Sequence, residues 1–127
     1  MKHIIEAHRY LENAKEILRE KAQKEKGYYQ DQKYVKMAGH TAYTGVLMAL
    51  DGHFRGERKR RKSVEWYKDA LAKEDKKILT TFNSAYHTLH LLMGYDGEQN
   101  VKIVKASLEE AEKIINWVET KGELVKA

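Results

Sequence analysis

The segment VKIVKASLEEAEKIINWV, from Val101 to Val118, decides the fold class. Its apolar residues recur at alternating steps of three and four, at Val101, Val104, Leu108, Ala111, Ile115 and Val118. This spacing places them in one stripe along an α-helix, and such a stripe is the packing seam of left-handed helical bundles. The other positions are mostly charged or polar. We therefore expect an amphipathic helix that packs against further helices.

Three more apolar stripes with helical spacing lie in the rest of the chain. The first is Ile4, Ala7, Leu11, Ala14, Leu18 and Ala22; the second is a row of small side chains, Val35, Ala38, Ala42, Gly45 and Ala49, flanked by Tyr43, Leu47, Leu50 and Phe54; the third is Ile78, Phe82, Ala85, Leu89 and Leu92. Proline is absent, so nothing interrupts these patterns. The small row predicts close approach of two helix axes, and the third stripe supplies large residues that fill the space opposite.

Capping signals divide the stripes into separate helices. The predicted stops are Gly27, Gly52, Gly56, Gly94 and Gly97, and the predicted starts are Asp31, Ser63 and Asp96, the last with Gln99 as a capping box. The stretch from Ser63 to Gly94 is too long for one helix in such a bundle, and the polar run 73–77 predicts a break, with a short helix 64–72 and a long helix 75–93. The sequence thus predicts an all-α fold in a single domain, residues 1–127: an up-down four-helix bundle with one extra short helix between long helices 2 and 3.

Composition limits the functional classes. The chain of 127 residues has no cysteine, which excludes a disulfide framework, a thiolate zinc site and a cysteine nucleophile. No apolar run approaches the roughly 20 residues of a membrane span. The first residues show no apolar core of a secretory signal. We expect a cytoplasmic protein that does not associate with membranes.

The positive charge is concentrated in one connection. Residues 55–62 hold six basic residues against one acidic residue, whereas the rest of the chain has 18 of each sign, so this segment carries the whole net charge of +5. The candidate anion- or nucleic-acid-binding residues are Arg55, Arg58, Lys59, Arg60, Arg61 and Lys62. The alternative interpretation is a solvated loop after a helix C-terminus, where cations are favoured. In the predicted topology this connection shares its end of the bundle with both termini, whereas the tyrosine-rich segment 28–34 shares the other end with residues 95 and 96.

Histidines and tyrosines form a second candidate site inside the bundle. Its members are His40, Tyr43, Tyr86, His87 and His90. His87 and His90 are three residues apart and resemble half of a metal site, but a third ligand is lacking and no Glu precedes a His by three residues. We interpret the cluster as hydrogen-bonded core or interface residues, with no metal and no cofactor. Nucleophile elbows, glycine-rich phosphate loops and His-Glu-x-x-His are absent as well, so we expect no enzyme.

Two segments carry a resemblance to a known class. The helix MAGHTAYTGVLMAL at 37–50 and the later NSAYHTLH at 83–90 resemble the HEPN class of small helical bundles, and the whole chain resembles an uncharacterised family of small helical proteins from Bacteroidetes. HEPN-like proteins include ribonuclease toxins and partners of small nucleotidyltransferases, and many act as dimers. The ribonucleases carry Arg-x-x-x-x-His or close variants, but here no Arg lies four to six residues before any histidine. The resemblance implies the bundle and the dimeric habit, without ribonuclease activity.

Two functions of different class follow. The favoured one is a non-enzymatic interaction module that forms a homodimer through apolar and aromatic surface such as Trp66, Trp117 and the tyrosine-rich segment 28–34. The alternative is a HEPN-like protein that binds a polyanion, a nucleic acid or a nucleotide, through the basic connection 55–62. Salt separates the two, because a complex dominated by phosphate contacts weakens steeply as salt rises.

Overall fold

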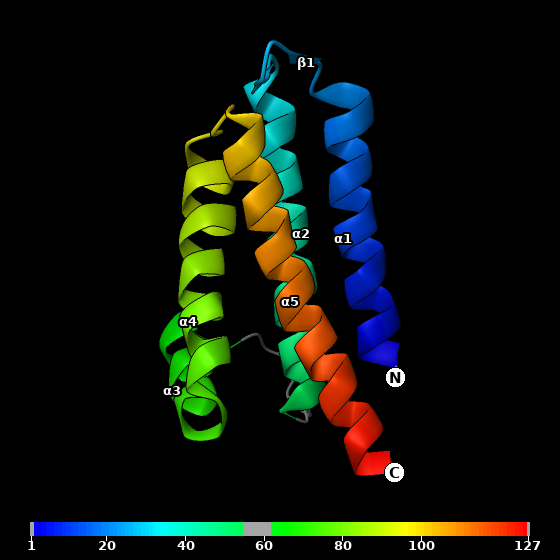
Figure 1. Ribbon diagram of the computed structural model, residues 1–127, viewed down its shortest axis with the longest axis vertical. Coiled ribbons are helices and arrows are strands. Elements are labelled where there is room, and N and C mark those ends of the chain that lie inside the picture. The colour runs from blue at the N-terminus through cyan, green and yellow to red at the C-terminus, as the bar shows by residue number, and fades with distance from the viewer. Residues whose placement is uncertain (1, 55–61, 127) are drawn as a thin grey trace.

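In the part of the chain that the structure describes, the protein is mostly helical, with five α-helices packed together (Figure 1). This computed structural model describes residues 2–54 and 62–126, and their side chains up to residue 122. The elements are α1 (Lys2–Lys21), β1 (Lys24–Glu25), β2 (Tyr28–Tyr29), α2 (Gln32–His53), α3 (Val64–Glu74), α4 (Lys76–Ala85), the π-helix η1 (Tyr86–Tyr95) and α5 (Val101–Lys126). The expected helical class is confirmed, and η1 continues α4 as the upper half of one long element.

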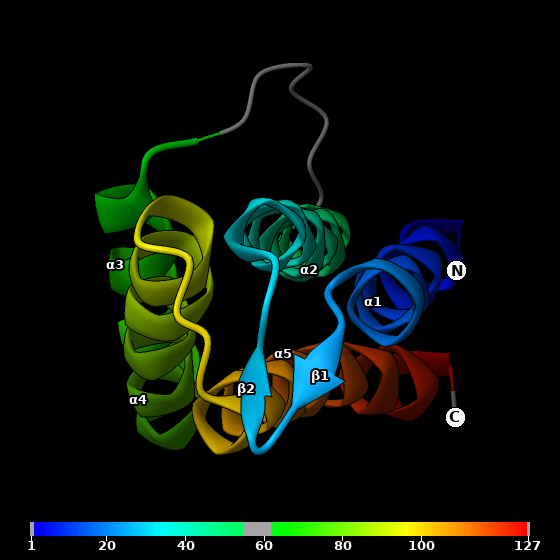
Figure 2. The same cartoon turned by 90° about the horizontal axis from the view of Figure 1, so that it is seen from above.

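The long elements alternate in direction and surround one core. Helix α2 lies between α1 and the α4–η1 element, and α5 lies on the opposite side of the core (Figure 2). The short helix α3 packs against α4 at the end of the molecule where the chain termini lie (Figure 1). The β1–β2 hairpin covers the other end. The tyrosine-rich segment 28–34 therefore lies at the end of the bundle opposite the chain termini, as the sequence predicts.

The small row on α2 brings two helices close together. If Gly45 carried a Cβ, that atom would lie 3.0 Å from the carbonyl oxygen of Ala7 and 3.1 Å from the Cβ of Tyr10 on α1. A side chain at this position would force its neighbours on α1 to shift by a few tenths of an ångström, so Gly45 lets α1 and α2 pack this closely without strain. The buried core takes side chains from all five helices, and its largest fully buried members are Tyr67, Phe82, Leu11, Leu50, Leu71, Leu89, Met93, Ile114 and Ile115.

The capping hydrogen bonds confirm two of the three predicted helix starts and contradict the third. The Asp31 carboxylate accepts from Lys33 N at the start of α2, and the Ser63 hydroxyl accepts from Trp66 N at the start of α3. The expected break in 73–77 is confirmed at Asp75, whose carboxylate caps α4. The predicted capping box of Asp96 and Gln99 is wrong: the Asn100 side chain accepts from the first backbone N–H groups of α5.

The sequence did not predict the hairpin. Helix α1 ends at Lys21, and Gly27 occupies the hairpin turn with a φ of +86° instead of ending a helix. Tyr29 N donates to Gln99 O at 2.8 Å, and the Gln99 side chain donates back to Tyr29 O at 2.8 Å. The side chain that was predicted to cap α5 therefore attaches the hairpin to the linker before α5. Gly52 and Gly94, also predicted as stops, lie inside α2 and η1, whereas Gly97 does take a positive φ of +66°.

No helix in residues 2–54 or 62–126 is long and apolar enough to cross a membrane.

Candidate functional site: an aromatic seam between α2 and η1

Five rings from α2 and η1 contact one another in a continuous row. We call this row the aromatic seam: His40, Tyr43, Tyr86, His90 and Tyr95. The His90 ring is its centre, stacked on Tyr43 at 5.0 Å between centroids, 5.3 Å from Tyr86 and 5.1 Å from Tyr95. These separations lie in the range of favourable ring pairs. The seam is therefore one packed unit of two imidazoles and three phenols.

The π-helix explains how Tyr86, His90 and Tyr95 share one face. Their spacing is four and then five residues. In an α-helix, which turns about 100° per residue, Tyr95 would lie roughly opposite Tyr86 on the helix. A helix closed by hydrogen bonds between residues five apart has a wider turn, so steps of four and five return to the same side. The ten-residue π-helix thus aligns rings that the α-helical pattern would separate.

A glycine on α2 holds the two helices at close range. A Cβ at Gly39 would lie 2.6 Å from the Cβ of Met93 and 2.7 Å from the carbonyl oxygen of Leu89, both in η1. Real Cβ atoms essentially never approach backbone this closely, so α2 contacts η1 directly at this point. The next residue, His40, also lies directly against η1, since a Cβ at Gly94 would be 2.8 Å from His40 Cε1. The rings of the seam therefore pack beside this close contact.

The seam is closed at one end and open at the other. Tyr43 is buried, Tyr86 and His90 are half-buried, and His40 and Tyr95 are exposed, Tyr95 to 62 %. The Nδ1 of His90 has no hydrogen-bond partner within the described part of the chain. Burial, and secondly the charge of His40, lower the pKa of His90. The lowered pKa favours the neutral imidazole at the centre of the seam, which has one hydrogen-bond donor and one acceptor.

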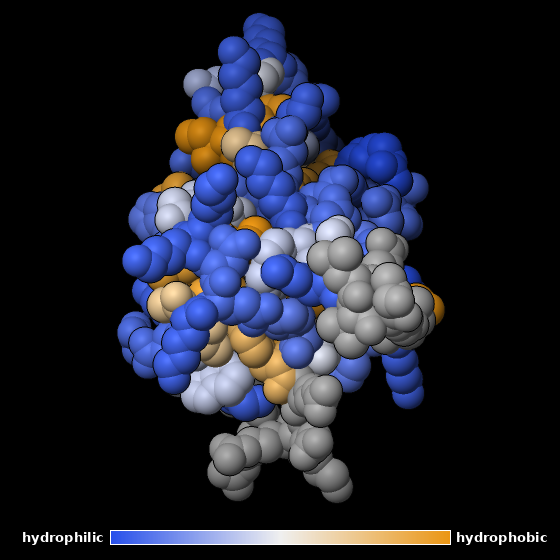
Figure 3. All heavy atoms as spheres, turned by 60° about the horizontal axis from the view of Figure 1, so that its bottom comes forward, coloured by the Kyte–Doolittle hydropathy of each residue, from blue (hydrophilic) through white to orange (hydrophobic). Residues whose placement is uncertain are grey.

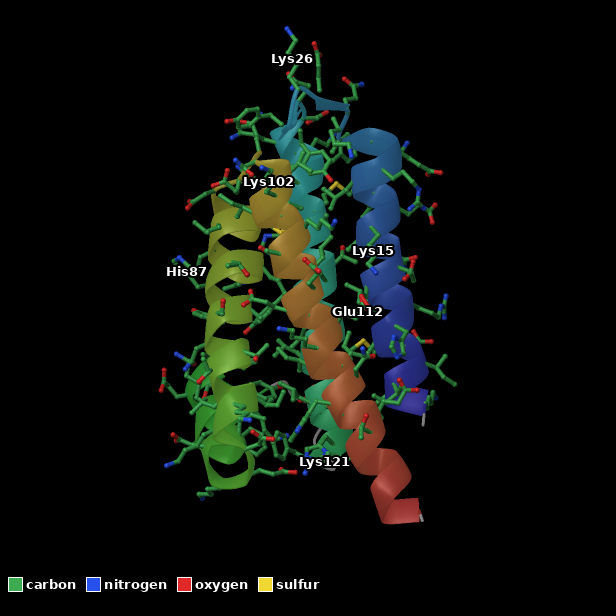
Figure 4. All side chains as sticks on the ribbon, viewed as in Figure 1. Lys15, Lys26, His87, Lys102, Glu112 and Lys121 are labelled. Atoms are coloured by element: carbon green, nitrogen blue, oxygen red, sulfur yellow. The ribbon has the colours of Figure 1, made fainter. Side chains whose placement is uncertain are left out.

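Four of the five residues predicted for this cluster come together. The exception is His87, which is exposed and points away from α2 (Figure 4). Tyr95 takes its place in the row, and only knowledge of the π-helical steps would have revealed it. The two imidazoles of His40 and His90 do not complete a metal site, since no cluster of three or more His, Asp or Glu residues suited to a metal occurs in the described ranges.

Most of the basic connection lies outside the described residues. This holds for Arg55, Arg58, Lys59, Arg60 and Arg61. Lys62 is described, and its Nζ lies 4.6 Å from the centroid of the Trp66 ring. The two flanks of the connection meet: Phe54 contacts Trp66 edge to face at 5.5 Å, and His53 Nε2 lies 2.8 Å from a Glu74 carboxylate oxygen. The end of α2 and helix α3 therefore contact each other directly.

Trp117, which the sequence suggests as interface surface, lies at the same end of the molecule, with its ring 4.8 Å from that of His53. It packs partly buried against the core, and its Nε1 donates to Asp75 Oδ2 at 3.2 Å. The backbone N–H of Ile78, helped by Lys77 N–H, Trp117 and Lys121, lowers the pKa of Asp75. The described surface at this end is mostly hydrophilic, with apolar residues only in small separate groups (Figure 3). The described residues on this face form no broad apolar patch (Figure 3).

The proteins that this chain resembles are described as being of unknown function. The profile of a family described as "Domain of unknown function (DUF5618)" matches residues 2–120. A solved structure of a protein of unknown function from Dyadobacter fermentans is 57 % identical, with a TM-score of 0.88, and the match covers 94 % of this chain and 95 % of that one. No curated protein matches the chain.

Proposed function

We propose that this chain, which belongs to the DUF5618 family, is a non-enzymatic interaction module that forms a homodimer through the open end of the aromatic seam. One observation carries the proposal: Tyr95 is 62 % exposed although its ring is held by His40 and His90. Met37, one turn before His40 on α2, is 44 % exposed. An exposed tyrosine held by neighbouring rings is typical of an interface anchor, and Met37 adds apolar surface one turn from His40.

A second copy of the chain suits this surface for two reasons. Imidazole and phenol groups both donate and accept hydrogen bonds, so the same patch can complement itself across a two-fold axis. Outside residues 55–62 the chain carries 18 positive and 18 negative residues, so two copies do not repel each other at long range through their bundles. Both features favour an isologous dimer. Dimers are also the habit of the HEPN class, and a HEPN-like bundle is the finer assignment that we propose for the fold.

Light scattering during size exclusion tests the dimer. The wild type is expected to elute with twice the monomer mass of 14.8 kDa at micromolar concentration. Tyr95→Glu with Met37→Glu is expected to yield the monomer, because two carboxylates per copy would be desolvated at the interface. Ile5→Glu is the matched control, since Ile5 is 56 % exposed but lies on α1. A wild-type monomer, or equal dissociation in the control, would exclude this interface.

A nucleic-acid-binding function is the second candidate, and the contact between Lys62 and Trp66 favours it. A cation beside a ring that is 37 % exposed is a pairing that can contact phosphate and stack on a base. Anisotropy of labelled single-stranded RNA at low salt is the measurement. Reversal of Arg58, Arg60 and Arg61 to Glu should abolish binding and leave the helix content unchanged. If the wild type shows no binding at low salt, this function is excluded.

A further inference from the structure

A cavity of about 580 Å³ lies between α1 and α5, directly below the hairpin. Its lining comes from three elements: Lys15, Leu18 and Arg19 of α1; Lys24 and Tyr29 of the hairpin; and Val101, Lys105, Leu108, Glu109 and Glu112 of α5. Lys15 and Glu112 lie on the facing sides of α1 and α5 (Figure 4), with Lys15 Nζ 3.4 Å from Glu112 Oε1. We call this cavity the α1–α5 groove. Its volume is in the range of small-molecule sites.

The groove has an apolar floor and a fixed roof. Leu18 and Leu108 form the floor and are 4 % and 8 % exposed. Tyr29 and Lys24 face each other across the hairpin and form the roof. Besides the two bonds between Tyr29 and Gln99, Val101 N donates to Gly27 O at 3.0 Å, so the roof is tied to the start of α5. The site is formed before any ligand arrives, which favours binding.

Cations outnumber carboxylates around this floor. The lining holds four basic residues and two acidic ones. Lys15 is neutralised by Glu112 and by Glu12, at 3.4 and 3.6 Å. Arg19, Lys24 and Lys105 form no ion pair with any carboxylate of the described ranges. The lining therefore presents three cations without an ion pair against one remaining carboxylate, Glu109, so positive charge is in excess next to an apolar surface.

Tyr29 adds a neutral donor at the same position. Burial raises the pKa of Tyr29, so its phenol keeps its proton at neutral pH. A protonated phenol and three cations are all hydrogen-bond donors. The upper half of the groove is thus suited to an acceptor-rich, negatively charged group, and its floor to the hydrocarbon part of the same molecule.

We propose that the α1–α5 groove binds a small organic anion with an apolar body. The anionic head, a carboxylate or a phosphate, lies between Arg19, Lys24 and Lys105. The apolar body lies on Leu18, Val101 and Leu108. This site is separate from the aromatic seam and from the basic connection, and it does not depend on the oligomeric state.

Fluorescence titration with 8-anilinonaphthalene-1-sulfonate tests the site, since this dye has an anionic head and an apolar body. Dodecanoate and dodecyl phosphate, kept below micelle formation, are expected to displace the dye with a stoichiometry of one per chain, and the tighter of the two identifies the head group. Dodecyltrimethylammonium is the matched cationic probe and is expected not to compete. Absence of saturable binding up to about 1 mM, or equal competition by the cation, would overturn the proposal.

Charge-reversal variants locate the binding. Arg19→Glu and Lys105→Glu are each expected to raise the dissociation constant at least about tenfold, because each removes a charged hydrogen bond to the head group. Lys21→Glu and Lys102→Glu are the controls: they change the net charge equally, lie on the same helices and are exposed, but do not line the groove. Circular dichroism verifies the fold of each variant. Equal weakening in variants and controls would show general electrostatic attraction and refute a site in the groove.

Discussion

The aromatic seam and the α1–α5 groove are both contacts between antiparallel helices in one bundle, yet the seam is filled with side chains and the groove leaves a cavity. In the seam, Gly39 lets α2 touch η1, and flat rings fill the remaining space. In the groove, long charged side chains stand between α1 and α5 and leave a cavity of about 580 Å³ above Leu18 and Leu108. Apolar stripes decide that helices pack, and the residues beside the stripes decide how closely.

Truncation of one leucine at each of the two contacts is expected to have the largest effect on the free energy of unfolding. Leu89, at the seam, is fully buried, so Leu89→Ala leaves a cavity that cannot fill and should lower the free energy of unfolding by about 3–4 kcal/mol. Leu108 borders the groove, where water already has access, so Leu108→Ala should lower it by about 2 kcal/mol. Urea unfolding followed by circular dichroism measures both. Equal losses would mean that the groove floor is packed as tightly as the seam.

The close approach at Gly39 can be tested by adding a single methyl group. Gly39→Ala places a Cβ 2.6–2.7 Å from Met93 and from the Leu89 carbonyl, and the strain should destabilise the protein by about 1–3 kcal/mol. Gly122→Ala is the control, because nothing lies within 4 Å of the added Cβ on α5. That exchange should stabilise by about 0.5–1 kcal/mol, the helix preference of Ala over Gly. If Gly39→Ala were also stabilising, the helices would not be in direct contact.

Local signals predicted the helices well. These signals are the four apolar stripes and N-caps such as Asp31 and Ser63. Each depends on residues one or two helical turns away, so it can be recognised in a single sequence. The capping box of Asp96 and Gln99 failed because a tertiary bond competes with it: the Gln99 side chain binds the Tyr29 carbonyl instead. The hairpin was missed because its strands have two residues each and Gly27 also resembles a helix stop.

The sites depend on which helices become neighbours, and the sequence revealed them only in part. Four seam residues were found because histidines and tyrosines in a core helix are conspicuous. Tyr95 and the exposure of His87 follow from the π-helix, which arises where Gly39 meets η1 and has no local signal. The groove was missed because Arg19 and Lys105 read as solvated positions until α1 and α5 are placed side by side.

His90 should make the stability of the protein depend on pH, and this dependence comes from the seam. Because the pKa of His90 is lowered in the folded protein, the unfolded chain, with a His pKa of about 6.5, binds more protons below neutrality. Stability from this group is present above about pH 7 and is lost as pH falls through 6.5 towards the folded pKa. In His90→Phe, which cannot take a proton, the free energy of unfolding in urea should change less between pH 7.5 and 5 than it does in the wild type.

Two groups set the controls for that measurement. His40 is the other imidazole of the seam, so His40→Gln is measured alongside to separate its share. His87→Gln changes an exposed ring three residues earlier on η1 and should shift stability at pH 7 by no more than about 0.5 kcal/mol. If His90→Phe kept the full pH dependence of the wild type, burial of a neutral ring would not be its source.

The smallest expected effect concerns the ion pair at the lower border of the groove. Lys15 Nζ lies 3.4 Å from Glu112 Oε1, but the two side chains are 34 % and 47 % exposed, so water and salt screen their attraction. Glu112→Gln should therefore lower the free energy of unfolding by only about 0.2–1 kcal/mol, and the difference should vanish in about 1 M salt. Glu12→Gln, on the same lysine from within α1, is the comparison. It should cost less, since a partner on the same helix does nothing to hold α5 against α1. A loss of several kcal/mol that persists in high salt would show that this pair, and not the apolar floor of Leu18 and Leu108, joins the two helices at the groove.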